Sequence, residues 1–308
     1  MGSGGHDMAQ DAEPLRLMVD SAQQTNATTC GPARSRYASA SEREVMTQQH
    51  HAWKSLVPVE DTALYVADSG GLGIPVVYLN GAYADQKHWR RVIADLGSGD
   101  FRHITYDERA RGRSHRSSDY SFEACLRDID TVLEAAGVEH PLIVGWSYGA
   151  TLAMHWAHQN PHRVRGVVAI DGAMPYDWID DDARARLRAL FRRMRWILPL
   201  ASRFGLAARM SSGQHAEVNI EANEMLSSLD QVLDELECPV RYVVASGGHL
   251  GTSDEEMAKV RATLDPVAQR KSNIRVSATV PSNHAAILRR EYAEVAHVVR
   301  ETSVAAGR

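Results

Sequence analysis

The pentapeptide Gly-Trp-Ser-Tyr-Gly at positions 145–149 places a serine between two glycines, at a change of local structure. The preceding residues 141–144 are apolar and rich in branched side chains, which predicts a buried strand. From Tyr148 onward, Ala, Leu, Met and Trp recur at helical spacing. A serine on a tight strand-to-helix turn, flanked by small residues, has the pattern of a nucleophile elbow. We therefore predict that Ser147 is a nucleophile, the alternative being a surface serine in a glycine turn.

A serine hydroxyl becomes a useful nucleophile only with a base in hydrogen-bond reach and an acid that orients the base. His284 is the best candidate base, because it follows the strand-like segment 274–281 and opens the last predicted helix. In a parallel sheet this position lies at the same edge as Ser147. The alternative for His284 is a surface histidine at a helix start.

Two carboxylates are candidates for the orienting acid. Asp171 ends the apolar run VVAID, on the strand directly after the nucleophile's strand and helix. Asp254 lies in the loop SGGHLGTSDEEM, where Ser253 and Glu256 have the spacing of a capping box. A charge in the first turn of a helix explains Asp254 without catalysis, and a strand-end turn explains Asp171 in the same way. We favour Asp171 and keep Asp254 as the alternative acid.

The oxyanion of an acyl-transfer reaction needs preorganised backbone donors. The N–H of Tyr148, directly after the nucleophile, is the first candidate. The second is the N–H of Ala82 in the loop LNGAYADQKHW, where Gly81 allows a sharp turn; a simple Asn-Gly turn is the alternative. Four further residues are predicted to bind substrate. Gly81 and Tyr83 lie in this loop, and Tyr176 and Trp178 lie at the start of the segment 175–238, which has no strand pattern.

Strands that alternate with helices must carry these residues. Several of the strands are continuous apolar runs, which suits a sheet covered on both faces and therefore a mostly parallel one. The pattern predicts an α/β fold with a doubly wound, mostly parallel, eight-stranded sheet. The expected strands are 55–59, 62–68, 74–80, 102–107, 141–146, 164–171, 239–245 and 274–280, and the expected helices include 85–96, 121–136, 148–159, 254–264 and 284–300.

The alternation stops between residues 175 and 238, which we interpret as a helical cap over the carboxyl edge of the sheet. Eight arginines between 184 and 209 are interpreted as a solvated face; attraction of an acidic substrate or an anionic membrane is the alternative. One apolar helix face is predicted from the spacing of Leu187, Leu190, Phe191, Met194, Ile197 and Leu198.

Composition bounds the remaining possibilities. The 308 residues are 44% apolar with a net charge of −5, which favours neither a nucleic-acid partner nor an anionic membrane surface. No apolar run approaches the length that membrane insertion requires. Three widely spaced cysteines, Cys30, Cys125 and Cys238, indicate reduced thiols and a cytoplasmic location. Residues 1–40 form a polar leader that begins like an expression tag and is expected to be poorly ordered. The expected core is therefore 41–174 with 239–308.

Four motifs together resemble the α/β-hydrolase family, over residues 55–300 and in the family's order. They are NGAYAD, YDERARGRS, GWSYG and SNHAAIL. The sequence departs from the family's pattern at three positions. Asn80 replaces a histidine, Ala110 replaces a glycine, and His249 stands where the family usually has its acid. The last departure favours Asp171, because some members that look similar place the acid one strand earlier.

The resemblance implies that Ser147 attacks a carbonyl while His284 takes its proton, and that water then releases the acyl-serine. It implies no metal and no organic cofactor. The expected substrate is a small to medium ester or lactone. Carbon–carbon bond hydrolysis of a diketone-like substrate is one alternative, and a non-catalytic small-molecule binder is another. Epoxide hydrolases and dehalogenases are disfavoured because they use an aspartate nucleophile. Neither the substrate nor the oligomeric state follows from the sequence.

Overall fold

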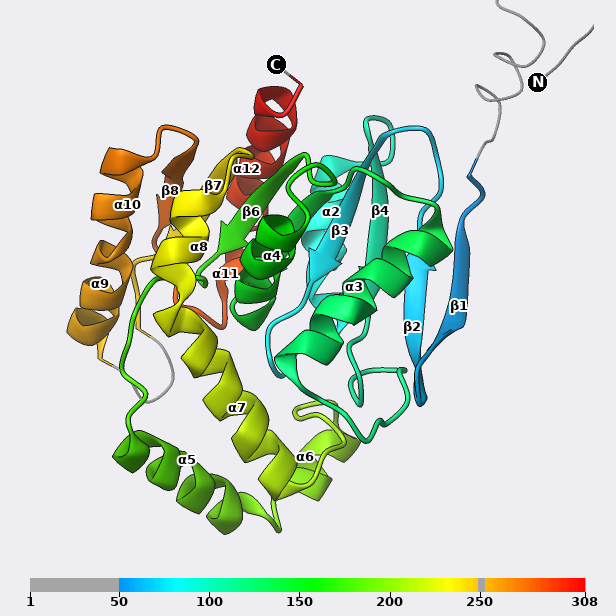
Figure 1. Ribbon diagram of the computed structural model, residues 1–308. Coiled ribbons are helices and arrows are strands. Elements are labelled where there is room, and N and C mark those ends of the chain that lie inside the picture. The colour runs from blue at the N-terminus through cyan, green and yellow to red at the C-terminus, as the bar shows by residue number, and fades with distance from the viewer. Residues whose placement is uncertain (1–49, 249–252, 308) are drawn as a thin grey trace, which may run out of the picture. The chain divides into compact units, whose positions relative to one another are not determined.

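The computed structural model describes residues 50–248 and 253–307 (Figure 1). The predictions for the leader, for Cys30 and for His249 therefore lie outside the described residues. Within them, eight strands form one sheet in the order β1-β2-β4-β3-β5-β6-β7-β8. β2 is antiparallel to both of its neighbours and the other pairs are parallel, which confirms the predicted sheet. The strands are β1 (Trp53–Val59), β2 (Thr62–Asp68), β3 (Ile74–Leu79), β4 (Phe101–Tyr106), β5 (Leu142–Trp146), β6 (Gly166–Ile170), β7 (Val240–Ala245) and β8 (Ile274–Val280).

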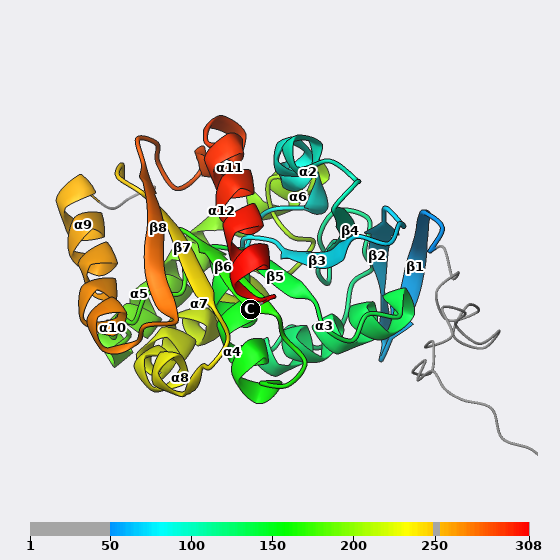
Figure 2. The same cartoon turned by 90° about the horizontal axis from the view of Figure 1, so that it is seen from above.

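Helices cover both faces of the sheet (Figure 2). One apolar cluster joins one face to α3, α4, α8 and α10, and a second joins the opposite face to α2, α11 and α12. Strand segments such as Val76–Leu79 and Val167–Ile170 are fully buried, as expected for a sheet covered on both sides. The helices named here are α2 (Arg90–Leu96), α3 (Phe122–Ala136), α4 (Tyr148–Gln159), α8 (Leu229–Glu235), α10 (Leu264–Arg270), α11 (Ile287–Arg290) and α12 (Tyr292–Ala305); a 3-10 turn, η1 (Gln86–Trp89), precedes α2 and α9 (Asp254–Ala262) precedes α10.

The strand register brings the predicted polar residues to one edge of the sheet. Trp146 on β5 pairs with Ile170 on β6, so the residues that follow them, Ser147 and Asp171, lie at the ends of adjacent strands. The Ser147 N–H donates to the carbonyl of Ile170 at 2.9 Å, and the Asp171 N–H donates to that of Val243 on β7 at 2.8 Å. These bonds continue the parallel ladders by one residue and fix the backbone of both positions.

The segment between β6 and β7 is helical, as predicted; we call residues 175–238 the helical insertion (Figure 1). It contains α5 (Asp181–Met194), α6 (Leu198–Arg203), α7 (Ser212–Ser227) and α8. Two ion pairs join α5 to α7, a partly buried one from Arg184 to Glu224 and an exposed one from Arg188 to Glu217, both at 2.8 Å. None of the helices in the described part of the chain combines the length and the hydropathy of a membrane-spanning segment.

The single apolar face predicted across residues 187–198 is wrong in part. Helix α5 ends at Met194 and a turn separates it from α6. Phe191 and Leu198 are buried against Ala216 of α7, whereas the side chains of Leu190 and Ile197 are 50% and 60% exposed. The reason is that α5 and α6 contact α7 along a narrow seam, which covers only part of the stripe.

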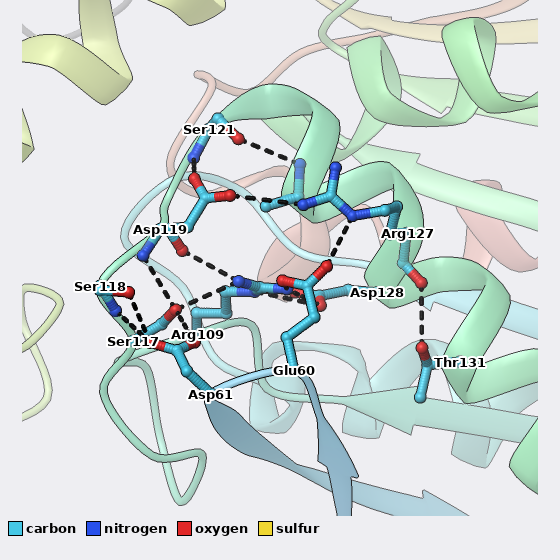
Figure 3. A network of polar contacts seen from close by, with 11 residues as sticks. Glu60, Asp61, Arg109, Ser117, Ser118, Asp119, Ser121, Arg127, Asp128 and Thr131 are labelled. Atoms are coloured by element: carbon cyan, nitrogen blue, oxygen red, sulfur yellow. Dashed lines mark hydrogen bonds and ion pairs between the residues drawn. The ribbon is translucent and has the colours of Figure 1, made fainter.

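The loop after β4 is fixed by a buried arginine (Figure 3). Arg109 binds Asp128 of α3 through two guanidinium nitrogens, and its third nitrogen donates to Ser117 and to the Asp119 carbonyl at 3.1 Å. It also pairs with Glu60 in the β1–β2 turn at 2.8 Å. The Arg109 and Asp128 side chains are almost fully buried, so the network ties the loop to the sheet and to α3.

The departure at Ala110 has a structural consequence. This residue is fully buried and has a φ of 61°, a left-handed conformation that glycine adopts more readily. Its N–H donates to the carbonyl of His115 at 2.8 Å, and its carbonyl accepts from the N–H of Arg209 at the same distance. The turn that the family forms with glycine is therefore kept here by the hydrogen bonds around an alanine.

We expect Asp128→Asn to lower the free energy of unfolding by about 3 kcal/mol, because it leaves the buried Arg109 guanidinium without its main counter-charge. Urea denaturation at pH 7 measures this value. Glu217→Gln removes an exposed pair with Arg188 and is the control, with an expected cost below about 1 kcal/mol. Equal costs for the two variants would contradict the structural role given to Arg109.

Candidate active site

Ser147 has the strained backbone of an elbow. Its φ is 55° and its ψ is −117°, a combination that non-glycine residues rarely adopt. It lies between the last residue of β5 and the first residue of α4, and its side chain is half-buried. The strained turn directs the chain from the sheet edge into the helix, which leaves the serine at the edge where the other strand ends meet.

Glycines make the elbow possible because backbone segments come too close for any side chain. A Cβ on Gly145 would lie 2.3 Å from the Gly149 carbonyl oxygen, and one on Gly149 would lie 2.3 Å from that of Leu79. The sequence predicted both glycines for this reason. A third, Gly172, was missed; its Cβ would lie 2.4 Å from the carbonyl oxygen of Ser147.

The structure brings His284 and Asp171 together. Nδ1 of His284 lies 2.9 Å from Oδ2 of Asp171, although the two residues are 113 positions apart in sequence. The Asp171 side chain is fully buried, and its φ of 42° turns it at the end of β6. The alternative acid is placed differently: Asp254 is the exposed first residue of α9, directly after the Ser253 cap.

A second cation holds the same carboxylate, and the sequence analysis missed it. Arg261 of α9 donates from Nε to Oδ1 at 3.0 Å and from Nη2 to Oδ2 at 3.1 Å. The backbone N–H of Ala245 also donates to Oδ1, at 3.0 Å. Burial alone would raise the pKa of Asp171, but the hydrogen bonds from His284 and Arg261 outweigh it and lower the pKa. The carboxylate is therefore ionised at neutral pH.

Trp146, the residue before the serine, packs against the candidate base. Its ring centroid lies 5.6 Å from that of His284 and 5.7 Å from that of His88. A Cβ on Gly81 would lie 3.0 Å from the same indole ring. Gly81 was predicted for its backbone freedom, but its φ is not positive, and the indole explains the glycine instead.

Buried polar groups hold the loop that carries Ala82. The Asn80 N–H donates to Glu108 at 3.0 Å, its side-chain amide donates to Glu108 at 2.9 Å, and its Oδ1 accepts from the Trp89 indole at 2.7 Å. Desolvation raises the pKa of the buried Glu108 carboxyl. Asn80 thus replaces the family's histidine as a fully bonded support, and its N–H is not available to a substrate.

Neither of the two predicted oxyanion donors has a hydrogen-bond partner in the described part of the chain. No hydrogen bond from the N–H of Ala82 or of Tyr148 is found within residues 50–248 and 253–307. The Ala82 carbonyl accepts from Nε of the buried Arg111 at 2.7 Å, which fixes the orientation of this peptide. Tyr148 opens α4, whose first N–H groups have no partner within the helix.

Two of the predicted aromatic residues form hydrogen bonds with α7 of the helical insertion. Tyr83, 42% exposed, exchanges hydrogen bonds with Asn219 of α7, and Asn219 Nδ2 lies 3.0 Å from the tyrosine oxygen. The Trp178 indole donates to Asn223, one turn further along α7, at 3.0 Å. Tyr176 is 41% exposed. The sequence analysis did not identify Asn219 and Asn223, because a polar residue on a predicted helix does not indicate which side chain it will contact.

Comparisons with known proteins relate the chain to hydrolases of one fold. A model of the family "alpha/beta hydrolase fold" matches residues 74–201. A haloalkane dehalogenase of Mesorhizobium japonicum is 28% identical over 46% of this chain and 46% of its own length. Epoxide hydrolase B of Mycobacterium tuberculosis is 33% identical over 31% of this chain and 28% of its own. The chain thus spans less than half the length of these curated relatives.

Solved structures resemble nearly the whole described part. A thermophilic esterase from Thermogutta terrifontis superposes with a TM-score of 0.64 at 19% identity, covering 84% of this chain and 100% of the other. A structure from a study of carboxylesterases of Nitrososphaera gargenis gives 0.63 at 16% identity, covering 82% and 99%. At these identities the likeness shows the fold.

We expect Gly172→Ala to lower the free energy of unfolding by more than about 2 kcal/mol, because its Cβ would displace the Ser147 backbone. Chemical denaturation compares it with Gly137→Ala, whose Cβ meets nothing within 4 Å but whose φ is 61°. Gly137→Ala therefore measures the effect of a left-handed backbone conformation alone, and it should lower the free energy of unfolding by about 1 kcal/mol. A smaller loss at Gly172 than at Gly137 would contradict the importance of this close approach.

Proposed function

We propose that this chain is a serine hydrolase of the α/β-hydrolase superfamily, which cleaves a small to medium carboxylic ester or lactone through an acyl-serine intermediate. The observation that carries the proposal is the 2.9 Å contact between His284 and Asp171 at the sheet edge where Ser147 forms its elbow. A nucleophile, a base and an acid from three different strand ends are the parts that acyl transfer needs.

In the proposed reaction, Ser147 Oγ attacks the substrate carbonyl while His284 takes the hydroxyl proton. Asp171 accepts from Nδ1 of His284, which leaves Nε2 as the base and stabilises the imidazolium that forms. The N–H groups of Ala82 and Tyr148 stabilise the oxyanion. His284 then protonates the leaving oxygen, activates water, and the acyl-serine is hydrolysed.

The choice of an ester or lactone rests on the serine at position 147. A dehalogenase or epoxide hydrolase is expected to use an aspartate there, whereas a serine suits attack on a carbonyl carbon. We further propose that the helical insertion is the cap of the site. Helix α7 supports this role, because its Asn219 binds Tyr83 in the loop that carries Ala82 and its Asn223 binds Trp178.

A fluorophosphonate probe, read by intact mass, tests the proposal. We expect rapid single labelling of the wild-type chain, no labelling of Ser147→Ala, and labelling slowed by about 10³–10⁴-fold in Asp171→Asn, because the histidine loses its orienting acceptor. Asp254→Asn, at the exposed start of α9, is the matched control and should label at the wild-type rate.

Each contrary outcome has a defined meaning. A wild-type chain that stays unlabelled and leaves 4-nitrophenyl acetate intact would contradict the serine-hydrolase proposal. Slow labelling of Asp254→Asn together with normal labelling of Asp171→Asn would assign the acid to the later loop.

Arg261 should set the pH range of the reaction. Hydrogen bonds from Arg261 help to lower the pKa of the buried Asp171 carboxyl, so Arg261→Met should raise that pKa and move the acidic limb of kcat/KM to higher pH. Arg261→Lys keeps the charge and should leave the limb near its wild-type position. The pH profile of ester hydrolysis measures both. Identical limbs for Arg261→Met and the wild type would contradict this role.

A further inference from the structure

One stretch of the helical insertion carries a local charge opposite to that of the whole chain. Residues 183–216 contain eight arginines and no aspartate or glutamate, whereas the chain has a net charge of −5. Arg186 lies 3.9 Å from Asp180 in an exposed ion pair, and three other arginines are held within the structure. Arg184 and Arg188 pair with glutamates of α7, and Arg209 donates to the carbonyls of the loop after β4.

Four other arginines point charge into solvent. No ion pair is found for them among the residues that the structure describes, and all four are exposed: Arg192, Arg193, Arg195 and Arg203. The guanidinium of Arg195 lies over the ring of Trp196, 4.9 Å from its centroid. The arginines therefore lie in the same short segment as large apolar side chains.

The apolar side chains of this segment are unusually exposed. Leu200 of α6 and Phe204, which ends the helix, are four positions apart and share one helix face, and Trp196 lies in the turn between α5 and α6. The opposite face is the packed one, where Leu198 is buried with Phe191. The exposed fractions are 50% for Leu190, 78% for Trp196, 60% for Ile197, 59% for Leu200, 72% for Phe204 and 71% for Leu206. We call these six side chains and the four arginines the α6 patch.

From this arrangement we propose that the α6 patch docks the protein on the surface of an anionic phospholipid bilayer. Exposed Trp, Phe and Leu side chains gain by entering the boundary between headgroups and acyl chains, and adjacent arginines gain by pairing with lipid phosphates. Large apolar side chains that are exposed together in one short segment are typical of an interaction site on a globular domain. Helix α6 lies at the end of the helical insertion away from the sheet (Figure 1).

Charge argues for a lipid surface over a second copy of this chain. In a two-fold dimer the same patch faces itself, so the four unpaired arginines of one copy would meet those of the other. Such like-charge contact opposes association, whereas an anionic bilayer supplies the missing counter-charge. The negative net charge of the whole chain led us to expect no attraction to anionic membranes. It is a sum over all residues and does not show the local excess of arginine.

Co-sedimentation of the full chain with vesicles tests the proposal. We expect binding to phosphatidylcholine vesicles that contain 30% phosphatidylglycerol, weak binding to pure phosphatidylcholine, and loss of binding at high salt. Replacing Arg192, Arg193 and Arg195 by glutamine should lower the partition coefficient by about 100-fold. The matched control replaces the exposed Arg90, Arg116 and Arg290 by glutamine, which removes the same charge elsewhere and should leave binding near the wild-type level.

The apolar contribution has its own pair of variants. Trp196→Ser with Phe204→Ser should lower partitioning by at least 10-fold. Leu72→Ser with Val304→Ser removes side chains that are 72% and 59% exposed outside the patch, and should have little effect. Ser147→Ala should bind as the wild type does, so a failed hydrolase assay and a failed docking assay are separate results.

Three outcomes would overturn the proposal. The first is no binding to the anionic vesicles, and the second is equal partitioning of the patch variants and their controls. The third is a wild-type dimer in light scattering that becomes a monomer in Trp196→Ser with Phe204→Ser, which would assign the patch to a second copy of this chain.

Discussion

The carboxylate of Asp171 is the interaction on which the candidate site depends. It joins the end of β6 to β7 through the Ala245 N–H, to α9 through Arg261, and to the loop after β8 through His284. These three partners lie far from Asp171 in the chain, and the carboxylate is fully buried. A charge in that position is tolerated only because every one of these neighbours donates to it. The same bonds that stabilise the ion fix the imidazole, so folding and chemistry depend on one group.

The elbow imposes a complementary constraint on the backbone. Ser147 has a strained conformation, and the close packing of Gly145, Gly149 and Gly172 around it leaves no room for side chains. Such strain persists only where the surroundings determine the conformation. Here the β5–β6 register and the N-terminus of α4 do so. The position of Ser147 therefore follows from the sheet, and the Asp171 network fixes His284 at the same edge.

The sequence predicted the strands well because short, continuous apolar runs are typical of a sheet that is covered on both faces. It also placed Ser147, His284 and Asp171 at one edge, since parallel strands share a carboxyl edge. Arg261 could not be predicted, because a helical arginine 90 residues from its partner has no local signature. The packing of the helical insertion could not be predicted either, because apolar spacing indicates a helix but does not show which of its side chains another helix will cover. The apolar side chains of the α6 patch are among those that no helix in the described part of the chain covers.

The most direct test of the central claim is the far-downfield proton NMR resonance of His284 Nδ1–H, recorded at a pH where the imidazole is protonated. An Asp171–His284 hydrogen bond of 2.9 Å predicts a resonance in the wild type that disappears in His284→Gln, which assigns it. It should also disappear in Asp171→Asn and persist in Asp254→Asn. A resonance that survives in Asp171→Asn, or that is lost only in Asp254→Asn, would contradict the role of Asp171, because another group would then orient the base.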